Sequence, residues 1–296
     1  MKWASLPPLV LDFDDSVNKL TDDEIRFPLQ GWQESLRFGC SLSDFQRFEK
    51  YLKLPEKFGC VFLGSGDYHH ISLTLLQRLA ATGEQFEVIV LDNHPDNMRY
   101  PFGIHCGSWV YHASRLPCVS HIHVLGITSG DIGWLHAWEN YLTPFLKKKL
   151  TYWSIGQDAG WLNYLGCKDS VKNFSNSDEL LYFFSKFSFF SDKLNFERKI
   201  YLSIDKDVFA PSVVKTNWDQ GLFEIKHLQE LFQICAGKLI GVDVTGEVSQ
   251  YSYKSSWKKF LSSLDKQPEI DSTQLKSWQE EQCSFNLKAL AMLHES

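Results

Sequence analysis

Short apolar runs alternate along this chain with stretches in which apolar residues recur at helical spacing. The runs cover residues 9–12, 60–63, 86–91, 122–127, 152–155, 199–204 and 238–242, and amphipathic stretches such as 44–52 and 224–236 lie between them. Strands that alternate with helices pair in parallel, because each helix carries the chain back to the start of the next strand. The pattern predicts an α/β protein with three layers, α/β/α, around a mostly parallel sheet.

No linker, low-complexity tract or internal repeat interrupts this alternation, so we expect residues 1–296 to form a single domain. A helix is expected over residues 131–150, and a closing helix over residues 280–294. Residues 249–279 are rich in Ser and Lys, lack clear periodicity and are expected to form a long excursion. Four tryptophans are expected to lie in the core: Trp109, Trp134, Trp153 and Trp161.

The net charge and the spacing of the cysteines indicate which partners and which cellular compartment to expect. The net charge is −6 and there is no long basic block, so we expect no nucleic-acid partner. The seven cysteines are scattered without a C-x-x-C pair, which favours a reducing cytoplasm over a disulfide framework. The first apolar run is broken by Pro7 and Pro8, unlike a signal peptide, and no apolar stretch is long enough to span a bilayer. We therefore expect a cytoplasmic protein without a membrane partner.

Three potential metal ligands follow the apolar run 86–91. Asp92, His94 and Asp96 are spaced two residues apart, so in an extended segment they point to the same side. Pro95 favours an extended or turn conformation at His94 and argues against a helix there. Taken alone, the segment is equally compatible with a metal site and with a solvated acidic turn that contains a chance histidine.

Several predicted strands end in an acidic residue: Asp12, Asp67, Asp92, Asp205 and Asp243. Ligands of parallel sheets bind beyond the carboxyl ends of the strands, so these acids are expected to converge on one crevice. A cluster of like charges repels itself, and bound cations would relieve that repulsion. The pattern therefore favours a metal site over an empty acidic cleft.

A second acidic pair, Asp205 and Asp207, follows the run 199–204. Combined with the ligands after residue 91 and with His69 or His70, it gives an oxygen-rich set that contains two imidazoles. This composition suits two manganese-like ions better than a structural zinc site, which prefers nitrogen and sulfur ligands. Residues 218–221, after the second pair, either line the pocket or form a turn that depends on Gly221.

Five segments occur in the same order as the motifs of the arginase (ureohydrolase) family and resemble them. The family motifs are a glycine-Asp-His turn, D-x-H-x-D, a His-Gly loop, S-x-D-x-D and G-x-D-x-x-E. Their counterparts here are Gly64-Ser-Gly66-Asp67-Tyr-His69-His70, Asp92-Asn-His94-Pro-Asp96, Ile104-His105-Cys-Gly107, Ser203-Ile-Asp205-Lys-Asp207 and Gly241-Val-Asp243-Val-Thr-Gly-Glu247. The resemblance covers residues 60–247 and implies an arginase-like fold.

The resemblance also implies roles for these residues. Two Mn²⁺ ions would be bridged by Asp92 and Asp205, with the remaining ligands divided between the two ions. His69, Asp96 and His70 would lie on one side, and His94 and Asp207 on the other. His105 would match the acid/base histidine of the family, and Glu247 would match the carboxylate that holds the guanidinium group.

The chain departs from the family pattern at three points. Tyr68 separates Asp67 from the histidines, so His69 and His70 both remain candidates for one ligand, with His69 favoured as the smaller displacement. Glu247 stands one residue later than the pattern places it. Segments that would grip the α-amino and α-carboxyl groups of free arginine are not recognisable. This combination resembles the peptide arginases, which convert arginine side chains of a precursor peptide to ornithine and release urea.

Other functions stay open at this point. Agmatine and free arginine are alternative guanidino substrates, and assembly into a homo-oligomer is compatible with all of them. The run 9–14 ends in D-x-D and resembles the first motif of haloacid-dehalogenase-type phosphatases, in which Asp12 would be the nucleophile. A metal-binding pseudoenzyme would keep the fold without turnover. For His105, the alternative is a buried structural histidine.

Overall fold

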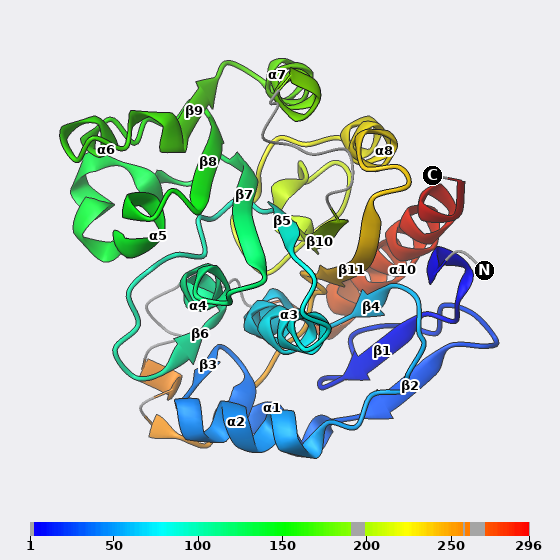
Figure 1. The fold of residues 1–296 in the computed structure, drawn as a ribbon. Coiled ribbons are helices and arrows are strands. Elements are labelled where there is room, and N and C mark those ends of the chain that lie inside the picture. Colours follow the sequence, from blue (N-terminus) through cyan, green and yellow to red (C-terminus); the bar gives the residue numbers. More distant parts are fainter. Residues whose placement is uncertain (1–2, 191–198, 257, 261–269, 296) are drawn as a thin grey trace.

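In the computed structural model, which describes residues 3–190, 199–256, 258–260 and 270–295, the centre of the protein is a nine-stranded sheet (Figure 1). Its strand order is β2-β1-β4-β11-β10-β5-β7-β8-β9, and its strand pairs are parallel. The strands are β1 (Leu9–Asp12), β2 (Ile25–Pro28), β4 (Val61–Phe62), β5 (Phe86–Leu91), β7 (Val119–Ile127), β8 (Leu150–Ile155), β9 (Val171–Phe174), β10 (Lys199–Asp205) and β11 (Leu239–Thr245). The predicted parallel sheet is confirmed.

Helices cover both faces of the sheet (Figure 1). Because side chains alternate between the faces of a strand, Val88 and Val90 of β5 enter one core cluster, while Ile89 and Leu91 enter the other. The first cluster contains side chains of α2 (Leu42–Tyr51), α3 (Ser72–Ala80), α4 (Trp109–Ser114), α5 (Thr143–Leu146) and α6 (Trp161–Tyr164). The second contains side chains of α7 (Ser177–Phe190), α8 (Ile225–Ile234) and α10 (Ser272–Glu295). The three-layer α/β/α prediction is thus confirmed.

The connection from β4 to β5 creates the place where a site can form. After β4 the chain runs through the 3-10 helix η3 (Gly66–Ile71) and α3 before it enters β5. In the sheet, however, β11 and β10 lie between β4 and β5. Such a change in strand order opens a crevice beyond the carboxyl ends of the strands. Beside it, α1 (Gln33–Leu36) precedes β3 (Gly39–Cys40), which pairs antiparallel with β6 (Ile104–His105).

The helix expected over residues 131–150 is wrong. The segment instead forms η5 (Gly130–Ile132), η6 (Trp134–Glu139) and α5, and β8 already begins at Leu150. The backbone is extended at Gly133 and at Asn140, so each short helix ends there. Trp134 is 57% exposed and lies outside the core, whereas the other three tryptophans are buried as expected.

The closing helix begins earlier than expected, at Ser272 rather than residue 280. Its start is capped by Asp271, whose Oδ1 accepts backbone N–H groups of Thr273 and Gln274. The expected excursion over residues 249–279 is therefore too long at its end, and its residues 257 and 261–269 lie outside the described part of the chain. Among the described helices, none has the length and apolar character needed to cross a membrane.

Candidate metal centre

Three neighbouring segments deliver the candidate ligands to the crevice. β5 ends at Leu91, so Asp92 stands directly beyond its carboxyl end, and Asp205 is the last residue of β10. These two strands are paired side by side. His69 comes from η3 after β4, and Asp207 from η8 (Lys206–Val208). The strand order therefore explains why ligands more than a hundred residues apart in sequence meet at one edge.

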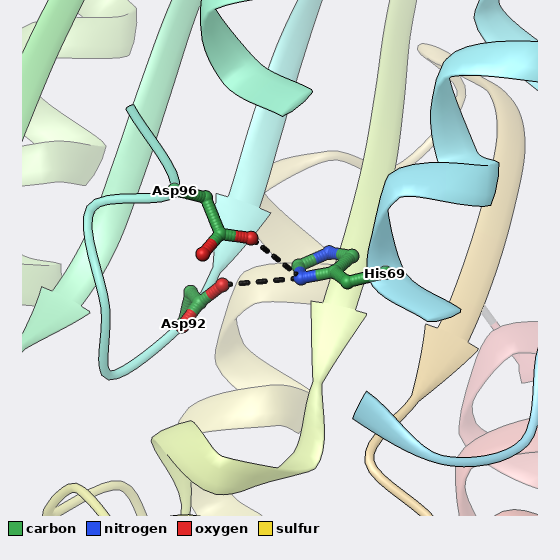
Figure 2. Close-up of side chains that lie close together, drawn as sticks. All are labelled: His69, Asp92 and Asp96. Carbon is green, nitrogen blue, oxygen red and sulfur yellow. Dashed lines mark ion pairs between the residues drawn. The ribbon is translucent and has the colours of Figure 1, made fainter. Parts of the chain in front are cut away.

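The first ligand group is centred on the His69 ring (Figure 2). Its Nδ1 lies 2.9 Å from Asp96 Oδ2 and 3.2 Å from Asp92 Oδ2. Asp205 Oδ2 lies 3.4 Å from the same nitrogen. All four side chains are buried. One nitrogen thus faces three carboxylates, which together could hold one metal ion.

The second ligand group is centred on His94 and shares Asp92 with the first. His94 Nδ1 lies 2.9 Å from Asp207 Oδ2 and 3.5 Å from Asp92 Oδ1. Asp92 therefore presents Oδ2 to one group and Oδ1 to the other. Asp92 could therefore contribute one oxygen to each of two metal ions.

The charges of the centre fit bound cations. Four buried carboxylates face two imidazoles: Asp92, Asp96, Asp205 and Asp207 face His69 and His94. Burial, reinforced by the negative charge of Asp92, raises the pKa of Asp96 and of Asp207 to about 7. Burial raises the pKa of Asp205 as well. Asp96, Asp205 and Asp207 are therefore unfavourable as ionised groups without a counter-charge. At Asp92, burial is outweighed by His69 and His94, which lower the pKa of that carboxyl. An oxygen-rich set with two imidazoles suits manganese-like ions.

Further hydrogen bonds orient the first group. His69 Nε2 lies 2.9 Å from Ser203 Oγ, which itself donates to Asp243 Oδ1 at 2.7 Å. Because the hydroxyl hydrogen is used on Asp243, Nε2 of a neutral His69 is the donor and Nδ1 keeps its lone pair toward the carboxylates. Trp109 Nε1 donates to Asp96 Oδ2 at 2.6 Å. Asp243 thus supports the candidate ligand His69 and belongs to neither group itself.

The second group has an outer partner of its own. His94 Nε2 lies 2.9 Å from Asp219 Oδ1. Trp218 and Asp219 both line the pocket. The segment also depends on Gly221, where a Cβ atom would lie 2.5 Å from the backbone oxygen of Val208, so both alternatives that the sequence left open for residues 218–221 apply.

The centre opens into a cavity of about 250 Å³. Its walls include Gly66, Met98, Cys106, Gly107 and Asp131 in addition to ligands of both groups. Sequence reasoning did not single out Met98 or Asp131, because neither belongs to a motif. Asp131 lies in the segment that was expected to be helical.

His105 also lines this cavity. Its Nδ1 accepts a hydrogen bond from the backbone N–H of Gly107 at 2.9 Å. The ring stacks on Tyr100, with 5.0 Å between the ring centroids. Burial lowers the pKa of His105 to about 4, so the imidazole is neutral near pH 7 with its proton on Nε2. The sequence-based role of this histidine in proton transfer is compatible with its position.

Two expected site residues lie elsewhere. His70 belongs to neither ligand group, is fully buried, and its ring nitrogens have no hydrogen-bond partner among the described residues. The geometry therefore favours His69 over His70 as the ligand. Glu247 does not line the cavity: its Oε1 lies 2.5 Å from Lys206 Nζ and 2.7 Å from Asn286 Nδ2.

The expectation that all five strand-end acids share one crevice is wrong. Asp243 is fully buried inside β11, because that strand continues to Thr245. Asp67 Oδ2 pairs with Arg37 Nε at 2.7 Å. Asp12 Oδ2 pairs with Arg26 at 3.0 Å, which also argues against Asp12 as a phosphatase nucleophile. Only Asp92 and Asp205 of the five reach the cavity.

Several solved structures have a similar fold over nearly the whole length of this chain. The formimidoylglutamase of Bacillus subtilis superposes with a TM-score of 0.52 at 14% identity, covering 99% of this chain and 92% of that one. The arginase of Bacillus caldovelox gives 0.51 at 11% identity, covering 97% of each chain. The proclavaminate amidino hydrolase of Streptomyces clavuligerus gives 0.50 at 13% identity, covering 98% and 93%. The chain has the arginase fold. The fold expected from the sequence resemblance is therefore confirmed.

Comparison of the amino-acid sequence does not assign this arginase-fold chain to a family. No family model matches it. A protein of Thermotoga maritima is 23% identical over 206 residues, which are 69% of this chain and 63% of that protein. The match thus spans less than two thirds of the relative's length. At such identities the likeness concerns the fold alone.

Proposed function

We propose that the protein is a metal-dependent hydrolase that cleaves a guanidino C–N bond and releases urea. The observation that carries this proposal is Asp92, whose two oxygens face two separate His/Asp groups beneath one cavity. Such a pair of groups suits two metal ions that share a bridging ligand. The arginase fold places this centre at the carboxyl ends of parallel strands, where ligands bind.

We further propose Mn²⁺ as the metal and assign the ligands from the geometry. His69 and Asp96 would hold one ion and His94 and Asp207 the other, with Asp92 shared between them. Asp205, which lies 3.4 Å from His69 Nδ1, would be the second bridging ligand that the sequence resemblance implies. Bound there, two Mn²⁺ ions would make water nucleophilic near neutral pH.

The residues of the cavity would orient the substrate and move its proton. A guanidinium group is a planar cation, and Asp131 offers a carboxylate on the wall that belongs to neither ligand group. His105 carries its proton on Nε2 because Nδ1 accepts from Gly107. In the proposed reaction, the neutral His105 ring would first take up the proton that the attacking water loses. The resulting imidazolium would then give a proton from Nε2 to the leaving amine and return to the neutral form. The products are urea and an ornithine-like amine.

For the substrate, we propose an arginine side chain within a peptide. Two of the segments that contribute to the cavity wall, through Met98 and Asp131, are joined by a bridge between Met98 and Asn140. Both segments carry exposed aromatic side chains, among them Phe102 and Trp138. Aromatic side chains of this kind can contact the residues that flank an arginine. Glu247 is not assigned to the guanidinium group, because Lys206 and Asn286 already occupy its Oε1.

The test is urea release by the Mn²⁺-loaded protein from an arginine-containing peptide, with free arginine and agmatine in parallel. Mass spectrometry of the peptide should show ornithine in place of arginine. If urea is released only from free arginine or agmatine, the proposed reaction stands and the peptide substrate is refuted. Bound metal without urea from any guanidino compound would refute the reaction and leave a metal-binding protein without turnover.

A further inference from the structure

We propose that Asp219 is a positioning residue that holds His94 in the orientation and tautomer needed to bind the second metal ion. The inference rests on the metal-dependent hydrolysis proposed above and deepens it. His94 Nδ1 points at Asp92 and Asp207, while Nε2 lies 2.9 Å from Asp219 Oδ1. The two ring nitrogens of His94 thus face different partners: Nδ1 faces the carboxylates of the second group, and Nε2 faces Asp219.

The chemistry of the two partners fixes the proton of the ring. An ionised carboxylate accepts hydrogen bonds and cannot donate one, so the nitrogen that faces Asp219 must carry the hydrogen. In neutral His94 the other nitrogen, Nδ1, is then free to bind a cation. Ser203 plays the corresponding part for His69 in the first group. The two groups therefore reach the same tautomer through different partners, a hydroxyl in one case and a carboxylate in the other.

Asp219 is itself held by the loop that carries the ligands. Asn93 Nδ2 donates to both the backbone oxygen and Oδ2 of Asp219, at 3.0 Å each. Asn93 is buried between the ligands Asp92 and His94, and its Oδ1 accepts from the backbone N–H of Thr128 at 3.1 Å. Its own backbone N–H donates to Asp207 Oδ1 at 3.0 Å. Asp219 is therefore attached to the ligand loop at two points, and a move of its side chain would release the His94 ring.

The neighbouring tryptophan limits where the loop can go. The Trp218 ring lies edge-on to His94, with 6.0 Å between the ring centroids. It also covers Gly66, where a Cβ atom would come within 3.2 Å of the Trp218 ring. A side chain at position 66 would thus press on the loop that places Asp219.

The expected loss of metal affinity depends on how exposed the Asp219 side chain is. Loss of an outer partner of a metal-binding histidine typically weakens metal binding roughly 10–100-fold. The Asp219 side chain is 69% exposed, so water can replace part of its hydrogen bond. We therefore expect a loss near the lower limit, about tenfold, confined to the second metal ion.

The experiment is a titration of the metal-free full chain with Mn²⁺ by isothermal calorimetry. Wild type is expected to bind two ions, and Asp219→Ala to bind one of them about tenfold more weakly. Asp219→Asn should fall closer to wild type, because its amide oxygen can still accept from Nε2. The matched control is Asp131→Ala, which removes the same charge from the same cavity without touching His94. A melting curve of each variant checks that it is folded.

The possible results separate the two proposals. Equal affinities in wild type and Asp219→Ala would overturn the positioning role and leave the proposed reaction standing. An equal loss in Asp131→Ala would also overturn it, because the effect would then be one of general charge. A wild-type chain that binds no Mn²⁺ would instead count against the proposed function itself.

Discussion

Replacement of Glu247 by leucine distinguishes the role implied by the sequence from the one implied by the structure. The sequence resemblance gives Glu247 to the guanidinium group of the substrate. In the structure it pairs with Lys206, at 2.5 Å between Oε1 and Nζ, and the two side chains are 2% and 0% exposed. Glu247→Leu would leave the Lys206 ammonium buried without its carboxylate. We therefore expect a loss of stability and unchanged substrate affinity.

The expected decrease in the free energy of unfolding follows from the burial of Lys206 and Glu247. Breaking a buried ion pair by removing one partner costs about 3–5 kcal/mol, because a charge stays buried without compensation. Gln282 Oε1 still accepts from Lys206 Nζ at 2.8 Å, which favours the lower part of that range. For a chain of this size, a loss of about 3–4 kcal/mol corresponds to a decrease in Tm of about 5–6 °C. Replacing both partners by apolar residues should recover much of the loss, because the buried charges are then gone.

The assay is a double-mutant cycle in the metal-free protein. Wild type, Glu247→Leu, Lys206→Met and the double variant are unfolded in urea, and the free energies of unfolding are compared. The exposed pair Lys226 and Asp178 supplies the control: Lys226→Met should leave the stability close to that of wild type. Kinetics with a guanidino substrate completes the set.

Two results would refute the reasoning. One is a Glu247→Leu variant as stable as wild type, since the carboxylate would then not compensate a buried charge. The other is a variant that keeps its stability and raises KM strongly, which would return Glu247 to the substrate. An unchanged KM together with lower stability would establish the structural role.

The remaining predictions concern the metal centre and its acid/base group. Asp92→Ala should lose metal binding and urea release together, whereas His105→Ala should lose urea release and keep metal, as measured by metal analysis after gel filtration. His69→Ala should weaken Mn²⁺ binding and His70→Ala should leave it close to wild type; the reverse result would exchange their roles. Finally, the unfolded chain protonates His105 near pH 6.5 and the folded chain near pH 4. Within that window the unfolded state binds more protons, so stability should fall as the pH falls, by up to about 3 kcal/mol relative to His105→Gln in urea unfolding at each pH. Parallel stability profiles for the two proteins would contradict that pKa shift.

Local patterns determined much of the architecture. The apolar run 86–91 is β5 because its alternate side chains are buried on two faces of a sheet, and that requirement is visible within the segment. The amphipathic stretch 44–52 likewise lies mostly in α2, whose first turn is capped by Ser41 Oγ, an acceptor for the backbone N–H of Asp44. The spacing of Asp92, His94 and Asp96 predicted that the three side chains lie near one another, because a short loop keeps them close, and all three line the cavity.

Local patterns failed where tertiary contacts override them. The segment 131–150 was expected to be helical, yet it breaks at Gly133 and Asn140. Asn140 forms a bridge with Met98, and the backbone N–H of Tyr141 donates to the backbone oxygen of Asn97. Those bonds hold the segment as part of the cavity wall. No pattern within the segment encodes them, because they depend on the fold around it.

The identity of each partner was decided only by the order of the strands. β10 lies between β11 and β5, so Ser203 reaches both His69 and Asp243, and Asp205 reaches the ligands beyond β5. The choice of His69 over His70, the contact of Asp219 with His94 and the capture of Glu247 by Lys206 all depend on segments far apart in sequence. The sequence by itself determined which residue types were available for a metal centre, because burial and spacing act locally. The tertiary structure decided which of them meet, because a side chain interacts with whatever the packed sheet places within a few ångströms of it.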